Sequence, residues 1–145
     1  NLNENNRAYM ITHNNMYNPD KFRNALLPDK TISNYLPYGS AILGAHPFPT
    51  DLFDANLIIT SSPFESVSIE ESYNKVFNEL VDSNKFEIIK SFDMKNGYKI
   101  LIYKRLIKVD IEEANLYLKE ISQKTEKYKE LYEEVINNYI KSNNL

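Results

Sequence analysis

The segment between Gly44 and Asp54 places one histidine close to two aspartates, the residue set in this chain best suited to acid–base chemistry. His46 can act as a general base if Asp51 or Asp54 orients its imidazole ring. The same three side chains offer an imidazole and two carboxylates to a metal ion. No nucleophile stands at a diagnostic spacing from them, so a structural interpretation is favoured, in which prolines fix an extended loop and Asp51 caps a short helical turn. We assign no catalytic residue and no metal ion here, and keep His46, Asp51 and Asp54 as candidate ligand-binding residues.

Three serines follow a predicted buried strand and precede a predicted helix, a place where an anion could bind. The hydroxyls of Ser61, Ser62 and Ser66 would hold it together with the free amide groups at the start of the helix. No glycine stands there to let the backbone wrap a phosphate closely, so ordinary helix capping is the favoured role. Ser61 and Ser62 remain candidate ligand-binding residues.

Tyrosine and phenylalanine make up 12% of the chain, enough for a platform on which sugar rings could stack. Tyr35 and Tyr38 are the residues expected to contact a glycan, together with Tyr9 and Tyr17. Most aromatic side chains fill protein cores, so a stacking role requires several of these rings to be exposed together.

The composition excludes several kinds of site. The chain has no cysteine, and therefore no disulfide, thiolate zinc site, iron–sulfur cluster or cysteine nucleophile. Its three glycines are too scattered for a Gly-x-Gly-x-x-Gly turn or a phosphate-binding P-loop. His13 and His46 lie 33 positions apart, which excludes the two-histidine helical zinc motif. We therefore expect no cofactor.

The charge balance argues against a nucleic-acid partner. The 145 residues include 17 basic and 20 acidic side chains, a net charge of −3, whereas nucleic-acid-binding domains concentrate basic residues on one surface. The basic run Lys99–Lys108 is the best local candidate, and we interpret it as charge that protects an edge strand. No stretch approaches the roughly 18 apolar residues of a membrane-spanning helix.

The elements that would position these residues begin with a short strand over 8–12 and a helix that starts at Asn18–Pro19 and stops at Pro28. Residues 31–55 lack a periodic pattern and are rich in proline, so we expect an irregular segment with a helical turn at 51–54.

An apolar run over 56–60 predicts a strand buried on both faces, as in the middle of a partly parallel sheet. A capping box at Ser68–Glu71 and helical spacing of apolar residues predict a helix that ends near Asn84 and crosses over to a further strand. Two β-rich runs around Asn96–Gly97 predict a hairpin over 86–105 with a two-residue type I′ turn.

A heptad-like pattern predicts one long helix from Asp110 to Lys141, opened by a second capping box. Such a helix would be about 48 Å long at 1.5 Å per residue, longer than a domain of this size is wide. Its first half would pack on the sheet while its second half bends back, or the helix would use its apolar stripe for self-association.

The predicted fold class is α/β in two or three layers. It has a small mixed sheet that ends in an antiparallel hairpin, followed by the long C-terminal helix. Residues 1–108 form the α/β domain, and residues 109–145 form a helical extension that packs in the same domain or projects from it.

From Asp51 to Arg105 the chain runs through an acidic turn, a buried strand ending in TSSPF, a helix rich in Asn and Phe, and the hairpin strands KFEIIKSF and YKILIYKR. This succession resembles the soluble extracytoplasmic C-terminal domain of bacterial multi-spanning membrane glycosyltransferases similar to the dolichyl-phosphate-mannose protein mannosyltransferases. The resemblance covers about 55 of the 145 residues and rests on the order of elements.

The resemblance implies an accessory role. Members of that family use a polyprenyl-phosphate-linked sugar donor, and their catalytic acidic residue lies in the membrane portion, to which no residue of this chain corresponds. The chain would be a non-catalytic domain at the extracytoplasmic face of the cell membrane, anchored by spans upstream of Asn1 and contacting a glycan or acceptor. Two alternatives stay open: a stand-alone α/β enzyme or ligand-binding domain around His46, Asp51 and Asp54, and an interaction module that uses the C-terminal helix.

Overall fold

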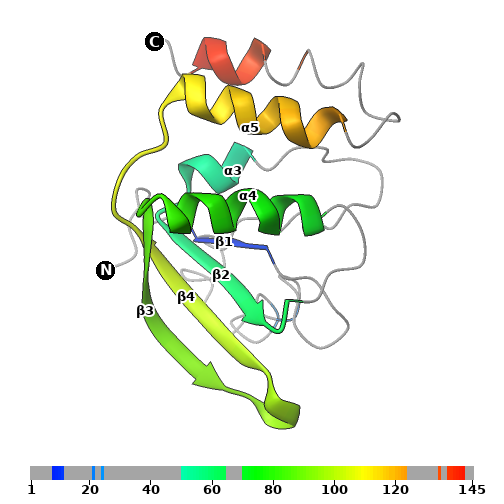
Figure 1. Ribbon diagram of the computed structural model, residues 1–145, viewed down its shortest axis with the longest axis vertical. Helices are drawn as coiled ribbons and strands as arrows, with labels where there is room; N and C mark the ends of the chain where they lie inside the picture. The colour runs from blue at the N-terminus through cyan, green and yellow to red at the C-terminus, as the bar shows by residue number, and fades with distance from the viewer. Residues whose placement is uncertain are drawn as a thin grey trace.

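The computed structural model describes residues 8–11, 21, 24, 50–64, 70–123, 134 and 137–142. Within these residues, four strands form one mixed sheet in the order β1-β2-β4-β3 (Figure 1). β1 (Ala8–Met10) runs parallel to β2 (Leu57–Ser62), while β4 (Lys99–Arg105) runs antiparallel to β2 and to β3 (Phe86–Asp93). The predicted mixed sheet ending in an antiparallel hairpin is confirmed.

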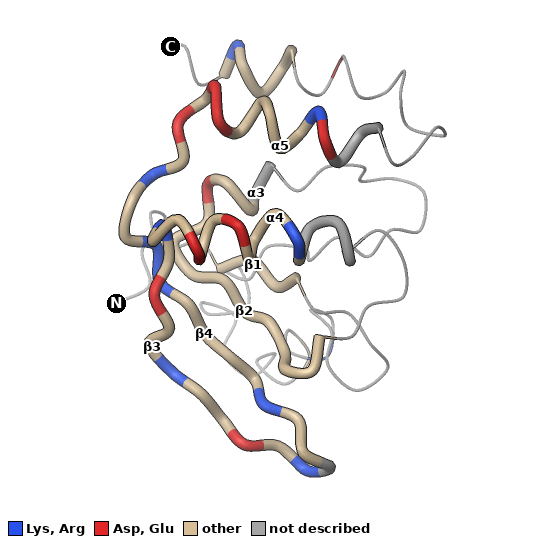
Figure 2. Tube along the Cα trace, in the orientation of Figure 1, with Lys and Arg blue, Asp and Glu red and all other residues tan. Residues whose placement is uncertain are grey.

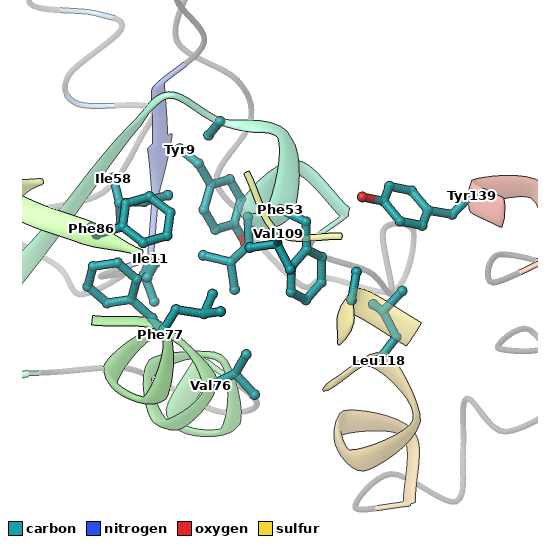
Figure 3. Close-up of a cluster of buried hydrophobic side chains, with 14 residues drawn as sticks. Tyr9, Ile11, Phe53, Ile58, Val76, Phe77, Phe86, Val109, Leu118 and Tyr139 are labelled. Atoms are coloured by element: carbon teal, nitrogen blue, oxygen red, sulfur yellow. The ribbon is translucent and has the colours of Figure 1, made fainter. Parts of the chain in front are cut away.

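Three helices lie on one side of this sheet: α3 (Thr50–Asp54), α4 (Glu70–Asp82) and α5 (Ile111–Gln123) (Figure 1). Residues 137–142 form a further helical segment. Apolar side chains of the helices and the sheet meet in one buried cluster (Figure 3), which consists of Tyr9, Ile11, Leu52, Phe53, Ala55, Ile58, Val76, Phe77, Leu80, Phe86, Val109, Ala114, Leu118 and Tyr139. The described helices and the sheet therefore share one core, with α5 packed against α4.

The opposite face of the sheet carries a second buried cluster, which consists of Ala8, Met10, Ile59 and Ile100. Successive side chains of a strand point to opposite faces, so Ile58 of β2 enters the first cluster and Ile59 enters the second. The prediction that this strand is buried on both faces is confirmed.

β2, α4 and β3 form a split crossover, because β4 lies between the two parallel strands that α4 connects. α4 ends at Asp82, close to the predicted end, and Asn84 follows with a left-handed φ of 55°. The backbone N–H of Asn84 donates to the Val81 carbonyl at 2.9 Å, and that of Lys85 donates to the Leu80 carbonyl at 2.8 Å. These two bonds satisfy carbonyls that the end of the helix would otherwise leave unpaired.

The hairpin is present, but its predicted two-residue type I′ turn is wrong. Such a turn needs a positive φ at both central residues, whereas only Gly97 has one, at 80°. The strands are instead joined through a 3₁₀ turn, η1 (Lys95–Gly97), which the Met94 N–H closes by donating to the Tyr98 carbonyl at 2.7 Å. Met94 and Tyr98 pack against the second cluster, and this packing favours the wider turn.

The basic run Lys99–Lys108 does not protect an edge, because β4 lies between β2 and β3. The edge strand on this side of the sheet is β3, with seven of its eight residues exposed. The sequence alone could not show this, since either strand of a hairpin can pair with the rest of a sheet.

The prediction of one long helix over 110–141 is wrong, whereas the alternative in which the second half bends back is confirmed. The helix begins as expected. The Glu113 N–H donates to the Asp110 carboxylate at 2.8 Å, as in a capping box, and α5 is 13 residues long. A continuous helix would separate Tyr117 from Tyr139 by about 33 Å at 1.5 Å per residue. Both rings instead have centroids within 6.4 Å of the Phe53 ring. The chain therefore turns back after α5, and Tyr139 completes the core that α5 covers.

Candidate functional site

Arg105, the last residue of β4, binds the end of the short helix α3. Its Nε donates to the Ala55 carbonyl at 2.8 Å, and its Nη2 donates to the same oxygen and to the Leu52 carbonyl, the latter at 3.3 Å. Its Nη1 donates to the Phe53 carbonyl. A cation that bonds the terminal carbonyls of a helix satisfies acceptors that have no partner within the helix. The guanidinium also lies 5.3 Å from the centroid of the Phe86 ring.

Asp54 and Tyr139 lie next to this contact. The Tyr139 hydroxyl donates to the Asp54 carboxylate at 3.4 Å, and Figure 3 shows the ring directed from the C-terminal helical segment toward Phe53. Burial raises the pKa of the Tyr139 hydroxyl well above its ordinary value, and the negative charge of Asp54 raises it further. Burial lowers the pKa of Arg105, and Asp54 opposes that shift.

The cluster of Asp54, Arg105 and Tyr139 is suited to holding α3, β4 and the C-terminal segment together. Arg105 directs its donors at backbone carbonyls, so they do not point at an external anion. Tyr139 keeps its proton at neutral pH, as a tyrosine with a pKa of about 10 does, and burial raises its pKa further, so its hydroxyl is not a base there. The geometry indicates a structural role for all three side chains.

The candidate residues from the sequence are only partly described. His46, Tyr35, Tyr38, Tyr17 and Ser66 lie outside the described residues. The backbone of Asp51 belongs to α3, but its side chain is outside the described part.

The described candidates do not come together at one place. Asp54 precedes β2, Ser61 is buried near the far end of that strand, and Ser62 is exposed at its last position. At about 3.3 Å per residue, the strand separates its two ends by about 17 Å. Asp54 and the serine pair therefore cannot hold the same small ligand.

Two further polar residues, Tyr9 and Thr60, are excluded as binding sites by their burial. Tyr9 is 1% exposed in the core, which excludes it as a platform for sugar stacking. Thr60 is also buried, and its hydroxyl has no hydrogen-bond partner. A single buried hydroxyl does not by itself define a binding site.

The β3–β4 hairpin and the segment that follows it carry five of the six exposed large apolar side chains of the described chain, together with exposed basic side chains. We call this set the hairpin surface. Its apolar members are Ile88, Ile89, Phe92, Leu106 and Ile107, between 45% and 53% exposed. Its basic members, all exposed, are Lys90, Lys95, Lys99, Lys104 and Lys108.

No protein-family model, curated protein or solved structure matches the chain. Among the described residues, no helix is long and apolar enough to cross a membrane. The same residues contain no group of three histidine, aspartate or glutamate side chains placed to share a metal ion.

The sequence interpretation missed both the Arg105 contact and the hairpin surface. From its neighbours in the sequence, Arg105 is indistinguishable from other basic residues at strand ends, because its carbonyl partners lie 50 to 53 positions away. The hairpin surface did leave a signal: Ile88 and Ile89 are adjacent apolar residues within a predicted strand, and adjacent side chains of a strand point to opposite faces.

Proposed function

We propose that the chain is a non-catalytic accessory domain of a membrane-bound glycosyltransferase-like protein, placed at the extracytoplasmic face of the membrane and acting by contact. The observation that carries the proposal is the hairpin surface, where five large apolar side chains are about half exposed beside five lysines. Exposed apolar patches on folded domains commonly mark contact sites. The identity of the parent protein is inferred from the resemblance of residues 51–105 to the C-terminal domain of these transferases. Such a parent protein would transfer sugar from a polyprenyl-phosphate-linked donor.

The arrangement of charged groups supports an accessory role for the described part. Arg105 donates hydrogen bonds to carbonyls at the end of α3, and the Lys85 Nζ pairs with the Glu113 carboxylate at 2.8 Å between partly buried side chains. Asp54, the described member of the predicted acid–base set, accepts a hydrogen bond from Tyr139. These groups connect elements of the fold to one another. Contact with a glycan or acceptor would fall to Tyr35 and Tyr38.

The test uses the complete gene product that contains this chain. We expect it to carry several membrane spans before Asn1 and its membranes to transfer sugar from a polyprenyl-phosphate donor. Replacing Ile89 and Phe92 together by serine should lower transfer at least several-fold while protein level and folding stay unchanged. The matched control is Leu116→Ser, which alters an apolar side chain 67% exposed on α5. A gene product that starts close to Asn1 without spans would overturn the proposal, as would unchanged transfer in the double variant.

A further inference from the structure

Among the described strands, β3 forms an open edge of the sheet, and the hairpin surface follows this edge from end to end. β3 is the last strand of the sheet, and only Phe86 of its eight residues is buried. Figure 1 shows the hairpin running beyond α4 and α5, away from the helical layer. The Leu106 N–H donates to the Lys85 carbonyl at 2.8 Å, which brings the exposed pair Leu106 and Ile107 beside the start of β3. Apolar side chains are therefore present at the base and along the length of this edge.

A bulge makes the edge apolar on both faces. Ile88 lies opposite Tyr103, whereas Phe92 lies opposite Ile100, because the register shifts between Ile88 and Lys90. Tyr103 packs against the helix-side cluster and Ile100 belongs to the cluster on the other face. Without the bulge, Ile88 and Phe92 would share one face. A surface that contacts this edge must accept apolar groups from both sides of the strand.

Positive charge gathers in the same region. Residues 85–108 hold seven basic and two acidic side chains, a net charge of +5, whereas the whole chain carries −3 and the remainder therefore −8. Figure 2 shows basic positions recurring along β3 and β4, while acidic positions predominate among the coloured residues of α4 and α5. Lys85 and Arg105 are engaged inside the fold, so five exposed lysines and two exposed acidic residues, Glu87 and Asp93, set the external charge at +3. Lys99 pairs with Asp93 at 3.5 Å, which leaves Lys90, Lys95, Lys104 and Lys108 as the main basic groups of the surface. Such a distribution orients the hairpin toward an anionic partner.

The pattern fits an anionic lipid surface better than a strand from another chain. A bulge and an edge lysine are two features that hinder strand addition, and β3 has both, in the bulge before Lys90 and in Lys90 itself. Long lysine stems can lie along apolar surface while their ammonium groups reach phosphate; the Lys90 Nζ is 5.7 Å from the centroid of the Phe92 ring. Half-exposed aliphatic and aromatic side chains can enter the boundary between headgroups and acyl chains. The hydrated headgroup layer can satisfy the unpaired backbone groups of the edge, which the hydrocarbon core could not.

We propose that the hairpin surface binds the surface of an anionic phospholipid bilayer, with the edge of β3 resting in the headgroup layer. The inference rests on the proposed function in placing the domain beside a membrane, and it names the partner of the same surface. It would fix how the domain is tilted over the membrane.

The test is cosedimentation of the full 145-residue chain with vesicles. We expect binding to vesicles of equal parts phosphatidylglycerol and phosphatidylcholine, little binding to phosphatidylcholine alone, and release as salt shortens the screening length from about 10 Å at 0.1 M toward about 3 Å at 1 M. Ile89→Ser with Phe92→Ser should lower the partition coefficient about tenfold or more. Lys90→Gln and Lys104→Gln should each lower it about fivefold. The control Leu116→Ser should bind as the unaltered chain does, and circular dichroism should show that every variant is folded.

Other outcomes would overturn the inference. Equal binding to both kinds of vesicle, no binding to either, or binding that the hairpin variants leave unchanged would each do so. If the chain forms a dimer without vesicles and the same variants dissociate it, the partner of the hairpin surface is a second copy of the chain that pairs along β3, and not a lipid bilayer. If the unaltered chain fails to bind anionic vesicles while the complete gene product transfers sugar, only this inference fails. If the unaltered chain binds those vesicles as expected while the complete gene product transfers no sugar, only the proposed function fails.

Discussion

Tyr139 donates a hydrogen bond to Asp54 at 3.4 Å, across 85 positions of sequence. This contact fastens the C-terminal helical segment to the end of α3, where Arg105 also binds. Tyr139→Phe keeps the ring in the core and removes only the hydroxyl. Because the bond is long and Asp54 is only partly buried, we expect a loss of about 0.5–1 kcal/mol in the free energy of unfolding, measured by urea denaturation. Asn138→Ala, an exposed neighbour, should change it by less than about 0.5 kcal/mol; equal effects of the two variants would contradict the role of the hydroxyl.

The same tyrosine should make the fold sensitive to alkali. Its pKa is raised in the folded chain, so the folded state holds the proton at pH values where the unfolded state, with a tyrosine pKa of about 10, has lost it. This contribution is fully present below about pH 10 and is lost as the pH rises from there toward the folded-state pKa. Tyr139→Phe should therefore lose less stability than the unaltered chain between about pH 10 and pH 11.5. Parallel stability curves for the two proteins would show that the shift is absent.

Arg105 should be irreplaceable by lysine. The guanidinium donates to carbonyls of Leu52, Phe53 and Ala55 at once, and a lysine ammonium lacks the planar fork that allows this. We expect Arg105→Met to lower the free energy of unfolding by about 2–3 kcal/mol, and Arg105→Lys to recover less than half of the loss. The matched variant is Lys104→Gln, one position away and exposed, which should be close to neutral. Full recovery by lysine would mean that charge near the helix end matters and hydrogen-bond geometry does not.

His46 should be dispensable for sugar transfer if the chemistry lies in the membrane portion of the parent protein. We expect His46→Ala in the complete gene product to leave the transfer rate within about twofold. A general base contributes about a hundredfold or more to a rate, so its removal would be easy to detect. A loss of that size with the domain still folded would favour the alternative of a catalytic site around His46, Asp51 and Asp54.

The sequence predicted the features that depend on neighbouring residues. The alternating and helical spacings located β2, α4 and the hairpin, and the capping box located the start of α5 at Asp110. The predictions that failed depend on contacts between residues far apart in the sequence. The apolar spacing after Asp110 is the same for one long helix as for two segments that pack on Phe53, and only the fold decides between them.

The candidate site shows the same division between local and distant information. Asp54 drew attention because of nearby His46, yet its described partner is Tyr139, far along the chain. Nothing within a few residues of Arg105 indicates that it binds α3. The two faces of the hairpin depend on a one-residue bulge near Ile89, which periodicity alone does not locate.

The apolar stripe of α5 should stabilise the chain itself and not a dimer. Ala114 and Leu118 are fully buried in the core with Tyr139, whereas Leu116, 67% exposed, lies outside that stripe. We expect Leu118→Ala to lower the free energy of unfolding by about 2–5 kcal/mol, and Leu116→Ala to change it by less than about 0.5 kcal/mol. If the stripe joined two copies, the stability of the unaltered chain would rise with protein concentration, because association shifts the equilibrium by mass action. We expect the denaturation midpoint to stay constant over a hundredfold range of protein concentration, and sedimentation without vesicles to show a monomer. A midpoint that rises with concentration in the unaltered chain, but not in Leu118→Ala, would show instead that the stripe forms a dimer interface.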